Sequence, residues 1–171
     1  MIRFILPDLR RLESTIAETV VLFRFSERVP FRGVASLIDW RLHGHLSRMT
    51  IEGFFTGDLG EPMLMPLCRF LPQRFLLVVG LGEKEKFSNE VFDTGLDRAF
   101  ELLDGLDTPN IVLALPGRVE NACPGSDAID WFIDRYDAAP HMRECHIVEP
   151  PGAQKTMVPA VERWRLRHLV P

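Results

Sequence analysis

At 171 residues, 46% of them hydrophobic and 26% charged, the chain has the composition of a soluble globular protein with one hydrophobic core. Its formal net charge of −4 argues against a nucleic-acid-binding protein, because such proteins usually carry a basic excess. No apolar run reaches the roughly 20 residues of a membrane-spanning helix, and the three cysteines lack the CxxC spacing of a zinc site.

The cysteines and the N-terminus both indicate a cytoplasmic protein. Cys68, Cys123 and Cys145 are odd in number and far apart, so we expect free thiols in a reducing compartment. The apolar stretch before Pro7 and Asp8 is too short for a signal peptide. We therefore expect a cytoplasmic protein that does not enter a membrane.

The first part of the chain predicts two strands followed by a helix. Residues 1–6 and 18–26 are rich in β-branched and aromatic side chains, which is typical of strands. From Val34 onward, apolar residues recur every three or four positions, which predicts a helix that ends before Gly53. Gly44 lies inside this helix and marks either a close contact or a break.

Residues 74–82, Arg-Phe-Leu-Leu-Val-Val-Gly-Leu-Gly, form the most distinctive stretch of the chain. The continuous apolar run predicts a strand buried on both faces, which can pair with a strand at residues 63–67. A strand that runs into a glycine turn can present backbone N–H groups to a phosphate or carboxylate. Gly80, Leu81 and Gly82 are therefore the candidate ligand-binding residues. The alternative is that the two glycines serve only the turn, since the third glycine of the dinucleotide fingerprint is missing.

The second half of the chain predicts helices that alternate with buried strands. Ser88 is a candidate N-cap for a helix whose apolar stripe extends to Leu103. Residues 110–115 and 144–148 predict two strands, separated by a capped helix that starts at Ser126. This alternation predicts an α/β fold with a mixed central sheet.

The C-terminal segment differs in composition from the rest. Residues 150–152, Pro-Pro-Gly, predict a linker, and Pro159 opens a short helix. We therefore predict one domain at residues 1–150, followed at residues 151–171 by a linker and a short helix. The arginines beside Trp164 favour a partner contact over nucleic acid, because one short basic patch releases few counterions.

Two clusters have residue types that could carry chemistry. Asp39 and His43 are four positions apart and would share a helix face, where they could bind a metal ion, but His45 would point elsewhere. Cys145 and His146, with His141 nearby in the sequence, could supply a nucleophile and a base, but adjacent residues of a strand point to opposite faces. We therefore expect a polar helix face and a plain strand, with no metal site and no catalytic residue.

Three short segments occur in an order that is typical of a known family. They are Gly44-His45-Leu46-Ser47-Arg48, Gly53-Phe54-Phe55-Thr56-Gly57 and Leu76-Leu77-Val78-Val79-Gly80-Leu81-Gly82, and the helix that follows Ser88 comes next. In these segments the chain resembles the N-terminal domain of the leucyl aminopeptidase family. The resemblance implies a three-layer α/β/α sandwich with a mixed central sheet, similar to macro domains.

The same resemblance implies what the chain does. In the family, a separate C-terminal domain binds two metal ions and hydrolyses peptides, and nothing here matches its Asn-Thr-Asp-Ala-Glu-Gly-Arg-Leu signature. The expectation is a stand-alone, non-catalytic domain without a cofactor, which serves protein binding, oligomer assembly or regulation. One alternative is a module that binds a nucleotide or ADP-ribose-like molecule in the macro-like crevice. The other is a hydrolase related to the aminopeptidases.

Overall fold

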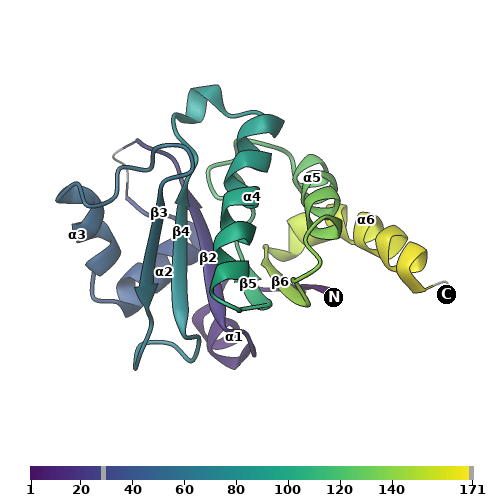
Figure 1. Ribbon diagram of the computed structural model, residues 1–171, viewed down its shortest axis with the longest axis horizontal. Helices are drawn as coiled ribbons and strands as arrows, with labels where there is room; N and C mark the ends of the chain where they lie inside the picture. The colour runs from purple at the N-terminus through teal and green to yellow at the C-terminus, as the bar shows by residue number, and fades with distance from the viewer. Residues whose placement is uncertain (28–29, 170–171) are drawn as a thin grey trace.

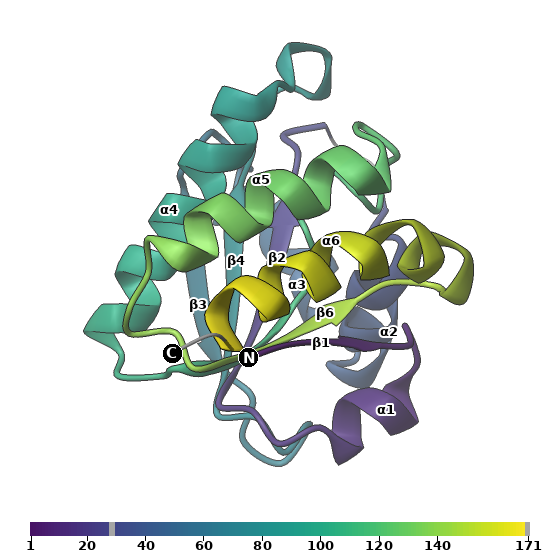
Figure 2. The ribbon, with the colours of Figure 1, turned by 90° about the vertical axis from the view of Figure 1, so that its right-hand side faces the viewer.

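The computed structural model describes residues 1–27 and 30–169, and these form a six-stranded sheet in the order β1-β6-β5-β2-β4-β3. Five strands are parallel, and β3 runs antiparallel to β4 at one edge. Helices cover both faces of the sheet (Figure 1, Figure 2). The predicted three-layer α/β/α sandwich with a mixed sheet is therefore confirmed. The strands are β1 (Ile2–Ile5), β2 (Thr19–Arg24), β3 (Pro62–Pro66), β4 (Phe75–Gly80), β5 (Asn110–Leu113) and β6 (Glu144–Val148).

Alternate residues of the strands enter two separate cores, because successive side chains of a strand point to opposite faces. On one face Val21, Leu77 and Ile111 pack in a core that also contains residues of α4 (Asn89–Gly105), α5 (Gly125–Asp137) and α6 (Pro151–Leu169). On the other face the core includes Val20 and Leu76 and residues of three shorter helices. These are α1 (Leu9–Ser14), α2 (Gly33–Arg41) and α3 (His45–Ile51). Burial on both faces explains why residues 75–79 are apolar without interruption.

The helix predicted from Val34 to before Gly53 is two helices, α2 and α3, with the break at Gly44. Gly44 has a φ of +76°, a conformation that glycine adopts without strain. Asp39 at the end of α2 accepts hydrogen bonds from the backbone N–H and the hydroxyl of Ser47 in α3. Of the two roles that the sequence allowed for Gly44, a close contact or a break, the structure shows the break. Asp39 joins the two helices across it.

The linker predicted at residues 150–152 is wrong, because α6 begins at Pro151 and continues to Leu169 with Pro159 inside it. Proline fits the first turn of a helix, because the backbone N–H groups there have no acceptor within the helix and the absence of one breaks no hydrogen bond. The indole N–H of Trp164 donates to Asp137 at 2.5 Å, and the Trp164 ring contacts that of Tyr136 in α5. The helix thus packs against α5 along the body of the fold.

Smaller differences concern the helix starts. The six-residue helix α1 has no counterpart in the predicted elements, and Asp8 caps it by accepting from the N–H of Arg11 at 2.8 Å. Helix α5 begins at Gly125 after Pro124, without the side-chain cap predicted at Ser126. Within the described residues, no helix has the length and apolar character required to cross a bilayer.

Candidate functional site

Gly80 and Gly82 lie at the carboxyl end of β4, where the loop of residues 53–61 passes directly over the strand. A Cβ atom at Gly80 would lie 2.0 Å from the carbonyl oxygen of Asp58, which no real side chain tolerates. Gly82 has a φ of +71°. One glycine is therefore required by a close backbone approach and the other by a left-handed turn.

The backbone N–H groups of this turn already have acceptors. Those of Gly80, Leu81 and Gly82 donate to the carbonyl oxygens of Glu61, Arg24 and Gly57, each at 2.8 Å. An anion could bind these three donors only by displacing the backbone bonds. Of the predicted residues, Gly80 and Gly82 therefore bond the loop of residues 53–61, whereas Leu81 bonds β2, beside the cavity described below.

A carboxylate of the chain occupies the loop itself. One carboxylate oxygen of Glu61 accepts from the hydroxyl and N–H of Thr56, at 2.7 and 2.9 Å, and from the N–H groups of Gly57 and Asp58, at 2.7 and 3.2 Å. Burial opposes ionisation of this group, but the hydrogen bonds outweigh it and lower the pKa of Glu61. The loop is thus closed around an internal anion.

A cavity of about 490 Å³ opens beside this loop, over the carboxyl end of β2. Its wall comes from three segments: the end of β2 and the residues after it, helix α3, and the loop of residues 53–58. Phe31, Ile51 and Phe55 supply apolar surface, whereas Ser47 and Thr50 supply hydroxyl groups. Hereafter this space is called the β2 cavity.

Arg24 is the buried cation of the β2 cavity, with only 8% of its surface exposed. Its guanidinium carbon lies 4.2 Å from the centre of the Phe31 ring, and Nη2 donates to the carbonyl oxygen of Glu27 at 3.4 Å. Burial lowers the pKa of Arg24, against the opposing effect of nearby carboxylates that include Glu120 and Asp39. Arg24 is therefore held in place by the protein itself.

The carboxylates of Glu27 and Glu120 both lie near this cation. Glu27 lines the cavity and accepts the backbone N–H of Lys84 with Oε1 at 2.6 Å. Its other oxygen is buried and has no hydrogen-bond partner among the residues that the structure describes. Burial raises the pKa of Glu120, although its own backbone N–H and the cations Lys84, Arg24 and Arg32 act in the opposite direction. The region is therefore rich in acidic groups.

The residues of the possible metal cluster have separate roles in the structure. Asp39 fastens α3 to α2, and the ring of His43 contacts that of Phe70 with 6.0 Å between their centres. Throughout residues 1–27 and 30–169, no three His, Cys, Asp or Glu side chains are grouped so that they could hold a metal ion.

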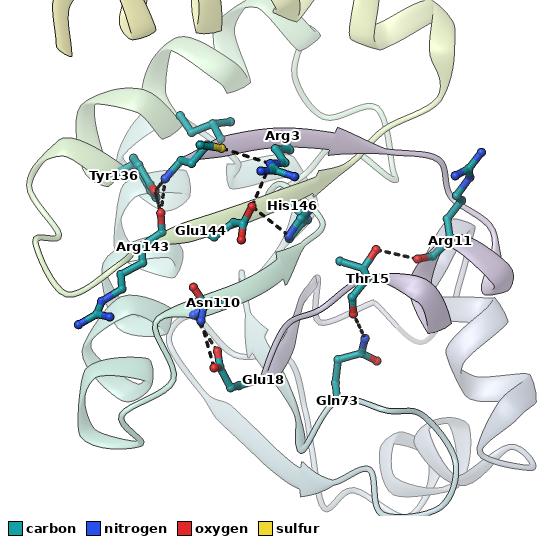
Figure 3. A network of polar contacts seen from close by, with 12 residues as sticks. Arg3, Arg11, Thr15, Glu18, Gln73, Asn110, Tyr136, Arg143, Glu144 and His146 are labelled. Atoms are coloured by element: carbon teal, nitrogen blue, oxygen red, sulfur yellow. Dashed lines mark hydrogen bonds and ion pairs between the residues drawn. The ribbon is translucent and has the colours of Figure 1, made fainter. Parts of the chain in front are cut away.

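Cys145 and His146 lie on opposite faces of β6, toward the amino ends of the strands and away from the β2 cavity. Cys145 is fully buried, and burial raises the pKa of its thiol far above the usual value. Burial lowers the pKa of His146, whose Nε2 lies 3.8 Å from the carboxylate of Glu144 (Figure 3). The two side chains do not meet as a nucleophile and a base.

Other polar contacts drawn in the same view tie together segments that are distant in sequence (Figure 3). Glu18 before β2 accepts from the backbone and side chain of Asn110 in β5, at 2.9 and 3.1 Å (Figure 3). The side-chain amide of the buried Gln73 donates to the carbonyl oxygens of Leu12 and Thr15, at 2.9 and 3.0 Å. These contacts connect α1 and the strands, which is a structural role.

The C-terminal basic patch is partly used by the fold. Arg165 donates from Nη2 to the carbonyl oxygen of Ile2 at 2.5 Å, and the ring of His168 stacks on that of Trp164. Trp164 itself is buried against α5. The side of α6 that carries Trp164 is thus covered by its own chain.

Sequence relatives are aminopeptidases that are much longer than this chain. A probable cytosol aminopeptidase of Synechocystis sp. is 29% identical over 101 residues, which cover 59% of this chain and 20% of that protein. One of Thermosynechococcus vestitus is 43% identical over 53 residues, which cover 31% of this chain and 11% of that protein. The chain therefore spans about a fifth or less of these curated relatives.

Solved structures with the same fold include macrodomains. A Trypanosoma brucei macrodomain in complex with ADP has a TM-score of 0.72 at 15% identity, covering 94% of this chain and 67% of that one. A tomato leucine aminopeptidase variant has a TM-score of 0.62 at 14% identity, covering 94% of this chain and 35% of that one. At such identities the likeness concerns the fold alone.

A family model matches more than half of the chain, at residues 20–130, and it describes the N-terminal domain of the cytosol aminopeptidase family. The matched residues include all of β2 except Thr19, and α2, α3 and the glycine turn after β4. The chain belongs to the cytosol aminopeptidase family, of which it contains the N-terminal domain.

Proposed function

We propose that this chain is a non-catalytic binding module of the family and that its ligand occupies the β2 cavity. The cavity carries the proposal, because its volume of about 490 Å³ lies within the range of about 300–1,000 Å³ that is usual for ligand pockets. It lies at the carboxyl end of a central parallel strand, which is where open α/β sheets bind ligands. A wall that combines apolar surface with polar and charged side chains suits a small organic molecule.

The macrodomain crystallised with ADP supports a ligand of nucleotide-like size. The proposal is tested by thermal unfolding and isothermal calorimetry with adenosine, ADP and ADP-ribose. We expect at least one of these to raise the melting temperature. The substitution Thr50→Phe, which fills the cavity from α3, should abolish that shift.

Thr156→Phe is the matched control. Thr50 and Thr156 each donate their hydroxyl to a helical carbonyl three residues earlier, at 2.8 Å, but Thr156 lies in α6. A ligand shift that Thr50→Phe leaves intact would place binding elsewhere. No stabilisation by any of the three compounds would contradict a nucleotide-sized ligand.

A second candidate is the assembly of copies of this chain, which an exposed aromatic patch favours. Trp40 and Phe70 are 69% and 39% exposed and line a hollow of about 340 Å³ with Arg41, His43 and Arg69. Tryptophan and arginine are enriched among residues that dominate binding energy at protein interfaces. We expect light scattering to detect a dimer that Trp40→Ala weakens at least tenfold, whereas Leu166→Ala, at another exposed apolar residue, leaves it unchanged.

The non-catalytic part of the proposal rests on the extent of the match to the family. The matched family model covers an N-terminal domain, and the relatives extend well beyond it. We expect no hydrolysis of leucine p-nitroanilide by the purified chain with added Zn²⁺ or Mn²⁺. Metal-dependent release of nitroaniline would refute this part and favour a hydrolase.

A further inference from the structure

The carboxyl end of the sheet has several groups that could attract an anion, and the chain supplies a carboxylate to each. The N–H groups of residues 56–58 surround the carboxylate of Glu61. The backbone N–H of Lys84 donates to Glu27. The carboxylate of Glu120 lies near the cationic side chains of Lys84 and Arg24. Internal carboxylates thus occupy the positions where a phosphate would otherwise be stabilised.

Carboxylates of the chain also make the wall of the β2 cavity acidic. Glu27 and Asp58 both line it, and Arg24 is the one cationic side chain among the lining residues within the described part of the chain. The guanidinium of Arg24 is already stacked on Phe31 and hydrogen-bonded to the carbonyl oxygen of Glu27. Among the lining residues that the structure describes, a phosphate in this cavity would meet two carboxylates and one engaged cation, so electrostatic repulsion disfavours it.

Glu27 also indicates that the described wall of the cavity lacks a hydrogen-bond donor for this carboxylate. One of its oxygens is buried without a hydrogen-bond donor among the described residues, and such a group costs free energy until a donor reaches it. A carboxylate accepts hydrogen bonds and does not donate them, so the missing partner is an N–H or O–H group. The aromatic rings of Phe31 and Phe55 supply the apolar surface beside it.

We infer that the β2 cavity selects a phosphate-free small molecule that presents an amino group to Glu27, and that it discriminates against nucleoside diphosphates. This inference rests on the proposed binding function of the cavity and names its ligand class. The amino group can belong to an aromatic heterocycle or to an aliphatic cation. Both forms make a charge-assisted hydrogen bond with the carboxylate.

The test is an NMR titration of the ¹⁵N-labelled chain with adenosine, agmatine and ADP. Adenosine represents the aromatic amine, agmatine the aliphatic cation, and ADP the same base with a diphosphate. We expect adenosine or agmatine to shift the amide signals of Ser47 and Thr56 at the cavity. We expect ADP to bind at least tenfold more weakly than adenosine.

The variant Glu27→Gln should weaken binding of the amine by about tenfold or more, the value of one charge-assisted hydrogen bond. Glu52→Gln, at an exposed carboxylate that follows α3, is the control and should leave binding unchanged. Glu27 also accepts the backbone N–H of Lys84, so its replacement could change the fold locally, and a second variant is needed. Asp58→Asn removes the other carboxylate of the wall and should reduce the difference in binding affinity between adenosine and ADP.

Two outcomes overturn the inference, and they have different consequences. Binding of ADP in the cavity as tightly as adenosine refutes the selection against phosphate and leaves the proposed binding function standing. The absence of cavity shifts with every probe contradicts both the inference and the proposed function.

Discussion

Replacing Gly80 with alanine tests whether the loop of residues 53–61 must lie directly on β4. The new Cβ would lie 2.0 Å from the carbonyl oxygen of Asp58 and 2.6 Å from the carbonyl carbon of Gly57, whereas ordinary contact begins at 3.4 Å. Both neighbours are backbone atoms, so no side chain can rotate away. The loop has to retreat from the strand by more than about 1 Å.

The magnitude follows from the contacts that this retreat would break. The loop and the turn are joined by three backbone hydrogen bonds, Gly60 to Gly80, Gly80 to Glu61 and Gly82 to Gly57, at 2.8–2.9 Å. Each contributes about 1 kcal/mol, and overpacking at a rigid site costs about 1–3 kcal/mol. We expect Gly80→Ala to lower the free energy of unfolding by about 4–6 kcal/mol, a large part of the roughly 5–15 kcal/mol of a typical domain.

Equilibrium unfolding in urea, followed by circular dichroism, measures this change. Gly105→Ala at the end of α4 is the matched control, because its Cβ would have no atom within 4 Å and its φ is not in the left-handed region. That variant should be neutral or more stable by up to about 1 kcal/mol. A loss below about 1 kcal/mol for Gly80→Ala would refute the close approach of the loop.

Three further predictions concern the ion pairs, thiols and acid response. Glu149→Gln breaks the buried pair with Arg118, which has an N–O distance of 2.9 Å, and should cost about 3–5 kcal/mol in urea unfolding. Arg98→Ala at an exposed pair should cost less than about 1 kcal/mol, and equal losses would contradict the argument from burial. Of the three cysteines, only the exposed Cys68 should react with Ellman's reagent at pH 8 before unfolding, since the other two are buried with raised thiol pKa values; rapid reaction of more than one would disprove it. Because the pKa of Glu61 is lowered in the fold, its stabilising effect is present above the unfolded pKa near 4.5 and is lost as the pH falls through the folded value. The melting temperature of wild type should therefore fall more steeply than that of Glu61→Gln below about pH 4.5, and parallel pH profiles would exclude this role.

Elements with a strong repeating pattern could be predicted from the sequence. Helix α4 has a regular apolar stripe, and Ser88 caps it by accepting from the N–H of Val91. Strand β4 is apolar throughout because both of its faces are buried. In both elements the local pattern and the final environment agree, so one segment carries enough information.

Other elements depend on contacts that no single segment reveals. Helix α1 has six residues, too few to show a period, and it is held by Gln73 from a distant loop. Residues 150–152 have the composition of a linker, yet Pro151 begins α6 because the helix packs on α5. Tertiary packing decides such cases over local propensity.

The β2 cavity could not be predicted because its wall comes from three segments that meet only in the fold. Thr56 and Asp58 lie in a stretch that contains three glycines, but this composition does not reveal that Glu61 closes the loop. A glycine in the sequence likewise indicates a constrained backbone, but it does not reveal which neighbouring group imposes the constraint. At Gly80 the constraint is the neighbouring loop, whereas the sequence left open whether the glycines serve a ligand or only the turn.

The pairing of β1 with β6 sets an order for assembly of the sheet. Ile2 pairs with Cys145, more than 140 positions later, whereas β3 and β4 are neighbours in the chain. During synthesis β1 cannot pair with β6 until β6, the last strand of the chain, has been made. Closing so long a loop is also slow, because it costs chain entropy. We therefore expect the β2–β4 centre to form first and the edge made by β1 to be the last part of the sheet to become protected from hydrogen exchange.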